Sequence, residues 1–292
     1  MKLVSWNVQW CRGCDGRVDP ARIVADARAL ADFDVLCLQE VADGFDDLDG
    51  SSGGDQFAEL AALLPGFAAI AGPAVDLPRA GGGRRRFGNL LLSRLPVGRV
   101  LRHQLPWPEA GAKAGMPRLL IEATLTTPLG PIRVMTTHLE YYSAANRAAQ
   151  VEAVRTAHAA ASRRARAAAA GEGPGAAGRQ PAAEGPFAAS PDTTATILTA
   201  DFNYRPDSAE HQRMQASFAD DSPRLCDAWT ALHPDRPHPP TLGVHDREQW
   251  PSAYPCDFIY LSEDLLPRAA RIVVDGQSRS SDHQPVLIEL GI

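Results

Sequence analysis

Three features that would narrow the function are missing from this sequence. Its 292 residues include only five cysteines, an odd number spread from Cys11 to Cys256, so no disulfide framework is indicated. No run of about 18 apolar residues occurs, which excludes a helix that spans a membrane. The net charge is −6 and the pI is about 5.8, so the chain lacks the basic surface of a non-specific nucleic-acid binder. An acidic enzyme can still hold an anionic substrate through bound cations.

The N-terminus lacks the apolar segment and cleavage site of a secretory signal. Met1 leads directly into the strand pattern Leu-Val-Ser-Trp-Asn. We therefore expect a cytoplasmic protein.

The sequence does contain many short, strongly apolar segments. Nine of them are predicted strands, at residues 3–7, 35–40, 90–93, 119–125, 132–138, 194–201, 257–261, 271–274 and 285–290. Continuous apolar runs of this length are typical of strands buried on both faces. Apolar residues at helical spacing predict helices over 20–30, 56–64 and 144 to about 170. Strands covered by a second sheet on one side and by helices on the other predict a four-layer α/β/β/α sandwich.

Two stretches are predicted to be flexible. Residues 171–191 are rich in Gly, Pro and Ala and cannot bury enough apolar surface to offset the entropy of ordering. Strand patterns continue on both sides of this insertion, so we predict one domain over residues 1–292. The basic segment Arg79–Arg86 is interpreted as a mobile, solvated loop, with a phosphate-gathering arm as the alternative.

Polar residues mark one end of six predicted strands. They are Asn7, Glu40, His138, the pair Asp201 and Asn203, Asp257, and the pair Asp282 and His283. Each alone is a common turn residue, cap or core histidine, but six together favour convergence at one rim. Side chains two residues apart on a strand point the same way, which places Asp201 beside Asn203. Oxygen ligands of this kind suit Mg²⁺ or Mn²⁺ rather than zinc.

Seven motifs in order along the chain resemble those of a known superfamily. They are SWNVQW, LQEV, FGNLLLSR, THLE, ADFNYRPDS, DFIYLSEDL and SSDHQPV, and they run from Ser5 to Val286. They resemble the endonuclease/exonuclease/phosphatase superfamily, which has the DNase I-like fold, and the Asp-Phe-Asn and Ser-Asp-His motifs are the most specific. The resemblance implies an α+β protein whose two mostly antiparallel sheets pack face to face, with a metal-dependent phosphodiesterase or phosphatase site at one rim.

The resemblance also implies metal ligands. Glu40 is expected to be the principal ligand of Mg²⁺ (or Mn²⁺). Asn7 and Asp282 are expected nearby, either completing the coordination or holding the water shell of the ion.

Catalytic roles follow from the same motifs. Asp201 is expected to orient or deprotonate the attacking water, and Asn203 to hold that water or a phosphoryl oxygen. His283 is expected to contact the phosphate while Asp257 fixes its tautomer. His138 is expected to be a further phosphate contact or a proton donor. Attack on phosphorus needs such donors and a cation, because charge develops on the phosphoryl oxygens.

Two positions depart from the pattern of the superfamily. Ala200 replaces the usual Gly before Asp-Phe-Asn, and we expect activity to survive this extra methyl group. Cys11 and Cys14 form a C-x-x-C pair where relatives have Gly. No second pair or nearby His completes a zinc set, so we interpret the pair as turn residues.

The substrate is less closely defined than the chemistry. An abasic endonuclease of the exonuclease III type is disfavoured, because Glu40 is followed by Val-Ala-Asp rather than Thr-Lys. A phosphodiesterase or nuclease is favoured, with a phosphomonoesterase of the inositol-phosphate type as the alternative. The partner is expected to be a phosphate ester, either nucleic acid or a phospholipid or inositol head group, and no protein partner is indicated. Trp107 and Trp250 lie in predicted loops, where they either stack on a base or simply pack.

Two readings without hydrolysis are weaker. A non-catalytic binding member of the superfamily would have lost Glu40, Asp201 or His283, and all three are present. A purely structural ion would not require Asn203 or His283.

Overall fold

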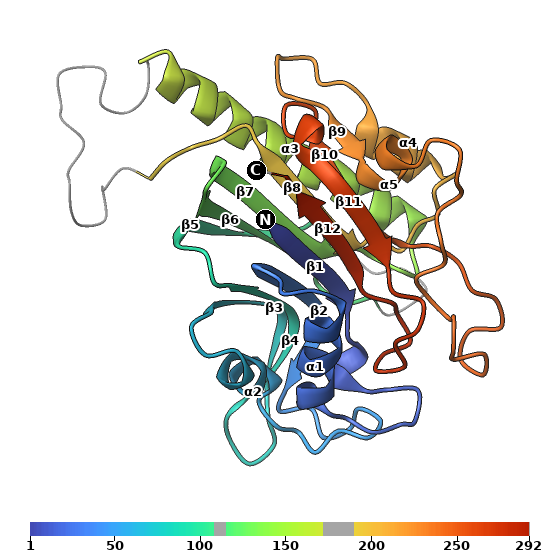
Figure 1. Ribbon diagram of the computed structural model, residues 1–292. Helices are drawn as coiled ribbons and strands as arrows, with labels where there is room; N and C mark the ends of the chain where they lie inside the picture. Colours follow the sequence, from blue (N-terminus) through green and yellow to red (C-terminus); the bar gives the residue numbers. More distant parts are fainter. Residues whose placement is uncertain (108–114, 172–189, 292) are drawn as a thin grey trace.

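Two six-stranded sheets stack in the computed structural model, which describes residues 1–107, 115–171 and 190–291 (Figure 1). The first sheet has the order β11 (Ala269–Val274), β12 (Val286–Leu290), β1 (Lys2–Asn7), β2 (Val35–Asp43), β4 (Arg84–Ser93), β3 (Ala68–Pro78). The second has the order β5 (Val97–Gln104), β6 (Leu119–Thr127), β7 (Gly130–His138), β8 (Thr196–Asp201), β10 (Asp257–Ser262), β9 (Leu225–Asp227).

Helices cover the outer faces of both sheets. The described residues form α1 (Pro20–Leu30), α2 (Gln56–Leu63), α3 (Ala144–Ala169), α4 (Ala209–Gln215) and α5 (Ala228–Leu232), with 3-10 turns η1 (Gln9–Cys11) and η2 (Leu266–Arg268). The three predicted helices begin where side-chain oxygens of Asp19, Asp55 and Ser143 accept backbone N–H bonds. Figure 1 shows α3 on one side of the molecule and α1 with α2 on the other.

Neighbouring residues of one strand enter different hydrophobic layers. Leu3 packs between the sheets, whereas Val4 packs with residues of α1 and α2. In β8, Ile197 packs between the sheets and Leu198 packs against α3. Alternating directions along a strand therefore fill three apolar layers between four layers of structure. The predicted four-layer sandwich, with strands buried on both faces, is confirmed.

Each sheet has one parallel strand pair at its centre. β1 pairs with β2 and β7 with β8 in parallel, and the other pairings are antiparallel. Parallel neighbours end at the same edge, and an antiparallel neighbour begins there. In the second sheet, Asp201 accordingly lies opposite both His138 at the end of β7 and Asp257 at the start of β10. The topology itself thus collects the polar strand ends at one rim.

The sequence failed to predict strands β3, β5 and β9 and helices α4 and α5. β3 contains Gly72 and Pro73, which normally interrupt strands; it lies at a sheet edge and has a bulge at this point. β5 is also an edge strand with alternating exposed residues. β9, α4 and α5 are three to seven residues long, too short for a periodic signal.

The predicted loop at Arg79–Arg86 was wrong for its last three arginines. Arg84, Arg85 and Arg86 begin β4 and form ion pairs, Arg84 with Asp76 and Arg86 with Asp43, both at 2.7 Å. Arg85 pairs with Asp47. These cations are therefore engaged within the protein.

Two sequence predictions concern segments that the structure only partly covers. Of the predicted insertion at 171–191, residues 172–189 lie outside the described residues, as do residues 108–114 before β6. Among the described helices, none has the length and apolar character of a membrane span.

Candidate active site

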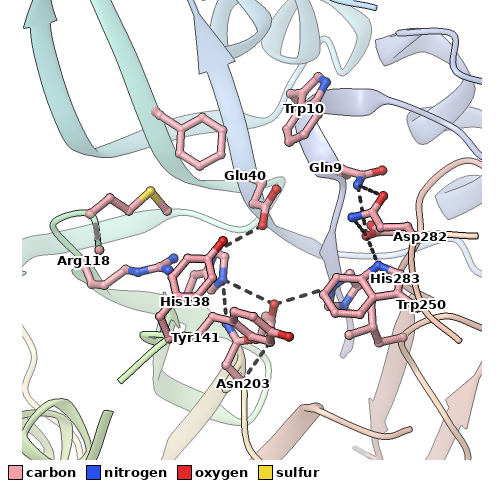
Figure 2. A pocket seen from close by; sticks show the side chains of 17 residues that line it. Gln9, Trp10, Glu40, Arg118, His138, Tyr141, Asn203, Trp250, Asp282 and His283 are labelled. Atoms are coloured by element: carbon pink, nitrogen blue, oxygen red, sulfur yellow. Dashed lines mark hydrogen bonds and ion pairs between the residues drawn. The ribbon is translucent and has the colours of Figure 1, made fainter. Parts of the chain in front are cut away.

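One pocket at the shared rim, with a volume of about 390 Å³, contains most of the predicted site residues (Figure 2). Its lining includes Glu40, His138, Asp201, Asn203, Asp282 and His283. Asn7 and Asp257 are buried and contact these lining residues by hydrogen bonds. The structure thus brings all eight predicted residues together.

Asn7 links carboxylates from the two sheets. Its Nδ2 donates to Glu40 Oε1 at 3.1 Å and to Asp201 Oδ2 at 2.9 Å. Its Oδ1 accepts the backbone N–H of Gln9 at 3.1 Å. The amide nitrogen therefore positions the two carboxylates, while the amide oxygen is already used within the protein.

Asn203 is held in a defined orientation beside Asp201. Its backbone N–H donates to Asp201 Oδ1 at 3.0 Å. Its Nδ2 donates to the carbonyl of Leu139 at 3.0 Å and contacts His138 Nε2 at 2.9 Å. Since the amide nitrogen can only donate, His138 Nε2 is the acceptor in this contact. The Oδ1 of Asn203 is left as the acceptor for a water or ligand.

His138 is a neutral imidazole in this arrangement. Burial, followed by the positive charges of Arg118 and His283, lowers its pKa well below 6.5. With Nε2 accepting from Asn203, the proton lies on Nδ1, 3.9 Å from Glu40 Oε1. His138 therefore positions Asn203.

His283 is a buried imidazolium. Its Nδ1 donates to Asp257 Oδ2 at 2.8 Å, and its Nε2 lies 3.6 Å from Asp201 Oδ2. Burial alone would lower its pKa, but the charges of Asp257 and Asp201 outweigh burial and raise the pKa well above 6.5. Asp257 thus fixes the tautomer and leaves the Nε2–H group directed at the pocket.

The carboxylates of the pocket are crowded. Burial and the nearby charge of Asp282 raise the pKa of Glu40 to about 7. Burial raises the pKa of Asp201 to about 6, even though His283 acts to lower it. Negative charge is therefore in excess here, and a cation would relieve it.

The donor set fits a hard divalent cation with Glu40 as its direct ligand. Glu40 keeps 20% of its side chain exposed, whereas Asp282 Oδ2 already accepts bonds from Gln9 Nε2 at 3.0 Å and Trp250 Nε1 at 2.9 Å. The Oε1 of Gln9 is buried and has no partner among the described residues. One partly exposed carboxylate surrounded by outer acceptors is the arrangement that Mg²⁺ prefers, since this ion retains several of its waters.

Strained backbone also marks the site. The non-glycine residues with positive φ in the described chain are Gln9, Trp10, Cys11, Glu40 and Asn203, and all except Cys11 line the pocket. Glu40 has a φ of 60° at a bulge in β2, and Asn203 a φ of 54° just after β8. Such conformations cost about 1–3 kcal/mol each and persist where the surrounding structure holds them. Their effect here is to turn two polar side chains into the pocket.

Sequence reasoning missed Arg118 as a site residue. It lines the pocket, is 5% exposed, and its Nε lies 4.0 Å from Glu140 Oε2. Neither its Nε nor its Nη1 has a hydrogen-bond partner among the described residues. A buried guanidinium with unpaired N–H groups is costly, and Glu140 offsets its charge only at 4.0 Å, so Arg118 adds positive charge to the wall of the pocket. The available signal was its place before β6, which runs antiparallel to β7 and so begins at the same rim.

The cysteines do not extend the site. Cys11 and Cys14 are both free, and burial raises the pKa of each thiol. Cys256 lies behind His283, with its thiol donating to Asp257 Oδ2 at 3.5 Å. Burial raises the pKa of the Cys256 thiol well above 9, so it is protonated.

A second histidine–aspartate cluster lies outside the pocket. His211 on α4 and His238 each place Nε2 at 2.8 Å from Asp227 Oδ2. Sequence reasoning did not identify this cluster, because its members are not at the ends of predicted strands.

Comparison with known proteins agrees with the fold and the motifs. A model described as Endonuclease/Exonuclease/phosphatase family matches residues 4–283. No curated protein gives a match. A solved endonuclease/exonuclease/phosphatase structure from Beutenbergia cavernae is 24% identical with a TM-score of 0.65, covering 100% of this chain and 72% of the other.

Two further solved structures are similar. The mannosyl-6-phosphatase Bt3783 of Bacteroides thetaiotaomicron is 17% identical with a TM-score of 0.62, and 100% of each chain is covered. The D. rerio TDP2 protein, complexed with a single-strand DNA product, is 18% identical with a TM-score of 0.58, covering 99% of this chain and 97% of the other. At these identities the likenesses establish the DNase I-like fold alone.

Proposed function

Because the chain belongs to the endonuclease/exonuclease/phosphatase family, we propose that it is a divalent-metal-dependent phosphodiesterase that attacks phosphorus with an activated water. One observation carries the proposal: Glu40 in β2, Asp201 at the end of β8 and His283 shortly before β12 meet in one pocket. There the carboxyl groups of Glu40 and Asp201 and the imidazolium of His283 lie within reach of one phosphate group.

The cation is proposed to be Mg²⁺ or Mn²⁺. Glu40 would hold it directly, while Asp282 and Gln9 would hold waters of its shell, and Asn7 keeps the Glu40 carboxylate in place. When bound, the cation would neutralise charge on the phosphoryl oxygens.

Asp201 is proposed to act as the general base. Its two oxygens are fixed by the backbone N–H of Asn203 and the Nδ2 of Asn7, and its raised pKa of about 6 lies close to neutral pH, where a base is most effective. The unused Oδ1 of Asn203 would accept a hydrogen bond from the same water. A phosphoryl oxygen cannot donate to that atom, so the structure supports the water-binding role for Asn203 over a phosphate contact.

Two cations of the chain are proposed to hold the phosphate. The Nε2–H of His283 would donate to a phosphoryl oxygen, since Asp257 keeps the ring charged and oriented. Arg118, which lines the pocket, would add a second positive charge facing the phosphate. His138 would act through Asn203 and not as a proton donor.

A diester is favoured because aromatic side chains lie on two sides of the pocket, where they can contact the two organic groups that a diester carries. Figure 2 shows Trp10 beyond Glu40, with Tyr141 and Trp250 on another side. A phosphomonoester is the second candidate, since Arg118 supplies the extra charge that a dianion would need. The similar structures include both a mannosyl-6-phosphatase and a protein with a DNA product, so they do not separate the two classes.

Hydrolysis of bis(p-nitrophenyl) phosphate and of p-nitrophenyl phosphate, each with Mg²⁺, Mn²⁺ or EDTA, tests the proposal. We expect the diester to be cleaved faster, the activity to be lost in EDTA, and added Mg²⁺ or Mn²⁺ to restore it. Faster cleavage of the monoester would move the assignment to a phosphatase. Cleavage that persists in EDTA would contradict the proposed chemistry.

His283→Gln tests the role of the imidazolium in the same assay, with His245→Gln as the matched control. It keeps a polar side chain but removes the imidazolium, so we expect a loss of about 10²–10⁴ in kcat. His245→Gln should have little effect, because His245 contacts the carbonyl of Gly276 and does not line the pocket.

A further inference from the structure

Aromatic side chains are concentrated in the pocket. Five of its 17 lining residues are aromatic, whereas aromatic residues make up 7% of the chain. They are Trp10, Phe87, Tyr141, Tyr142 and Trp250. The hydrolytic chemistry proposed above uses none of them, so their presence needs another explanation.

Tyr141 and Trp250 form a wall on one side of the pocket (Figure 2). Their rings meet edge to face with centroids 5.8 Å apart, and Tyr141 also meets Tyr142 at 5.0 Å. Tyr141 follows β7, while Trp250 lies in the connection before β10. Two distant segments of the chain thus build one aromatic surface.

Trp250 is held firmly in this wall. Its indole Nε1–H donates to Asp282 Oδ2 at 2.9 Å. Gly243 has a φ of 69°, and a Cβ there would stand 2.6 Å from Trp250 Cβ, so only glycine allows this close approach. Trp250 is therefore fixed in position and connected to Asp282, one of the residues proposed to surround the cation.

The wall is also open to a ligand. Tyr141 is 40% exposed although it lies at the rim of a pocket. Stacking of a second flat ring on an exposed aromatic ring at a binding site makes the free energy of binding more favourable. A volume of about 390 Å³ lies at the lower end of ligand pockets, which leaves space for a phosphate with one attached ring system.

The charges argue against a polymer as the ligand. Arg118 is the only arginine or lysine among the described residues that line the pocket. The arginines at the start of β4 form ion pairs within the protein, Arg84 with Asp76 and Arg86 with Asp43. A nucleic-acid polymer is held mainly by cations spread along its phosphates, and the described surface of the pocket offers no such series.

We infer that the substrate is a small phosphate ester bearing a planar aromatic group, of the size of one nucleotide, whose ring stacks on the exposed ring of Tyr141, which the edge-to-face contact with Trp250 supports. The inference rests on the proposed function for the placement of the phosphate. It adds that recognition comes from the aromatic ring and that a sugar phosphate without an aromatic group is a poor ligand.

Calorimetric titration of the protein with adenosine 5′-monophosphate and with ribose 5-phosphate, both in Mg²⁺, tests the inference. The two probes share ribose and a 5′-phosphate, and ribose 5-phosphate has a hydroxyl group in place of the base. We expect the nucleotide to bind about 10- to 100-fold more tightly, as one stacked base provides. Equal affinities would overturn the inference.

Variants of Tyr141 locate the effect. Tyr141→Leu should reduce the preference for the nucleotide at least about fivefold, whereas Tyr141→Phe keeps the ring and should retain it. Trp107→Leu is the matched control, because Trp107 is 55% exposed but does not line the pocket. A preference that survives in Tyr141→Leu would contradict the role of the wall.

Hydrolysis is measured separately, so the two proposals fail in different ways. Cleavage of bis(p-nitrophenyl) phosphate together with equal affinities would refute the stacking inference and leave the proposed function intact. Preferential nucleotide binding without any cleavage would refute the proposed function instead. Tighter binding of a single-stranded oligonucleotide than of the nucleotide, with a steep salt dependence, would overturn the assignment to a small ligand.

Discussion

The chain contains two buried histidine–aspartate clusters with nearly identical local geometry. In the pocket, His283 Nδ1 lies 2.8 Å from Asp257 Oδ2. Under α4, His211 Nε2 lies 2.8 Å from Asp227 Oδ2, and His238 contacts the same oxygen at the same distance. The residue types and distances match, and yet His283 of the first cluster opens on a pocket of about 390 Å³, whereas Asp227 and His238 of the second border a cavity of only about 10 Å³.

The cluster at Asp227 is closed. Its Oδ1 accepts the backbone N–H groups of Trp229 and Thr230 at the start of α5, and its Oδ2 accepts both histidines. Burial acts to raise the pKa of Asp227, but the two histidine hydrogen bonds outweigh burial and lower it to about 2.

A metal is disfavoured at Asp227 by the same contacts. Gln215 uses its Oε1 to accept the Asp227 N–H, which directs its Nε2 at His211 Nδ1. His211 therefore carries its proton on Nε2 and donates a hydrogen bond from it to Asp227 Oδ2, so that nitrogen is not free to ligate. The cluster is interpreted as structural.

The pocket cluster is open by contrast. Burial disfavours the charged form of Asp201 and raises its pKa to about 6. Arg118 and Gln9 each have buried polar atoms without a hydrogen-bond partner among the described residues. The comparison teaches that a histidine–aspartate pair alone does not define an active site. What distinguishes the two regions is that polar atoms beside the active-site pocket lack partners among the described residues, whereas both oxygens of Asp227 are paired.

The largest expected effect is the loss of activity in Glu40→Gln. Glutamine keeps the volume and can still accept from Asn7, but it loses the charge proposed to hold the cation. We expect kcat/KM for bis(p-nitrophenyl) phosphate to fall about 10³-fold or more, since a cation supplies several kcal/mol to such a reaction. Glu59→Gln, at an exposed position on α2, should retain activity; equal losses in both variants would refute the assignment.

The second effect is on stability and concerns Asp227→Asn. It should lower the free energy of unfolding by about 3 kcal/mol, because the buried His211 and the half-buried His238 lose their anionic partner. Urea unfolding measures this loss, and the specific activity of the folded variant should change less than threefold. Asp235→Asn, at an exposed position, serves as the control. A change below 1 kcal/mol in Asp227→Asn would show that the cluster is not structural.

A smaller effect on activity is expected for Asp257→Asn. The hydrogen bond to His283 can persist, but the charge that keeps His283 an imidazolium is lost. We expect kcat to fall about 10- to 100-fold, as for other residues that orient a catalytic group. Thermal unfolding should show a smaller stability loss than in Asp227→Asn, and the opposite ranking would remove the distinction between the clusters.

The smallest effect is the acid dependence of stability. Asp227 has a pKa lowered from 3.8 to about 2 by folding, so its contribution is present above pH 4 and is lost as pH falls towards 2. The difference in unfolding free energy between the wild type and Asp227→Asn should therefore shrink by about 1 kcal/mol between pH 5 and pH 3. A difference that stays constant across this range would contradict a charged Asp227.

The sequence predicted the rim well because the signal there is strong. Asn7 and His138 each end an apolar strand, and an apolar run that ends in a polar residue is readable without a structure. Parallel central strands then bring such ends together. The edge strand β3 was not readable, since Gly72 and Pro73 normally exclude a strand and only its place at the edge permits them.

The contacts that define roles were beyond the sequence. The orientation of Asn203 depends on the Leu139 carbonyl and on His138, and these contacts leave its Oδ1 as the acceptor on which the proposed water-binding role rests. Arg118 has no motif, and its importance appears only when the structure shows it buried without a described partner. Both are consequences of packing between segments distant in the sequence.

The most direct test of this account is to compare Asp201→Asn with Asp227→Asn in two assays, hydrolysis of bis(p-nitrophenyl) phosphate and urea unfolding in EDTA. Asp201→Asn should lose about 10²–10⁴ in kcat while its free energy of unfolding stays equal or rises, because burial opposes the native charge. Asp227→Asn should show the reverse, with activity retained and stability lost. If Asp201→Asn kept wild-type turnover, or if both variants lost activity and stability together, the pocket would not be the catalytic site proposed.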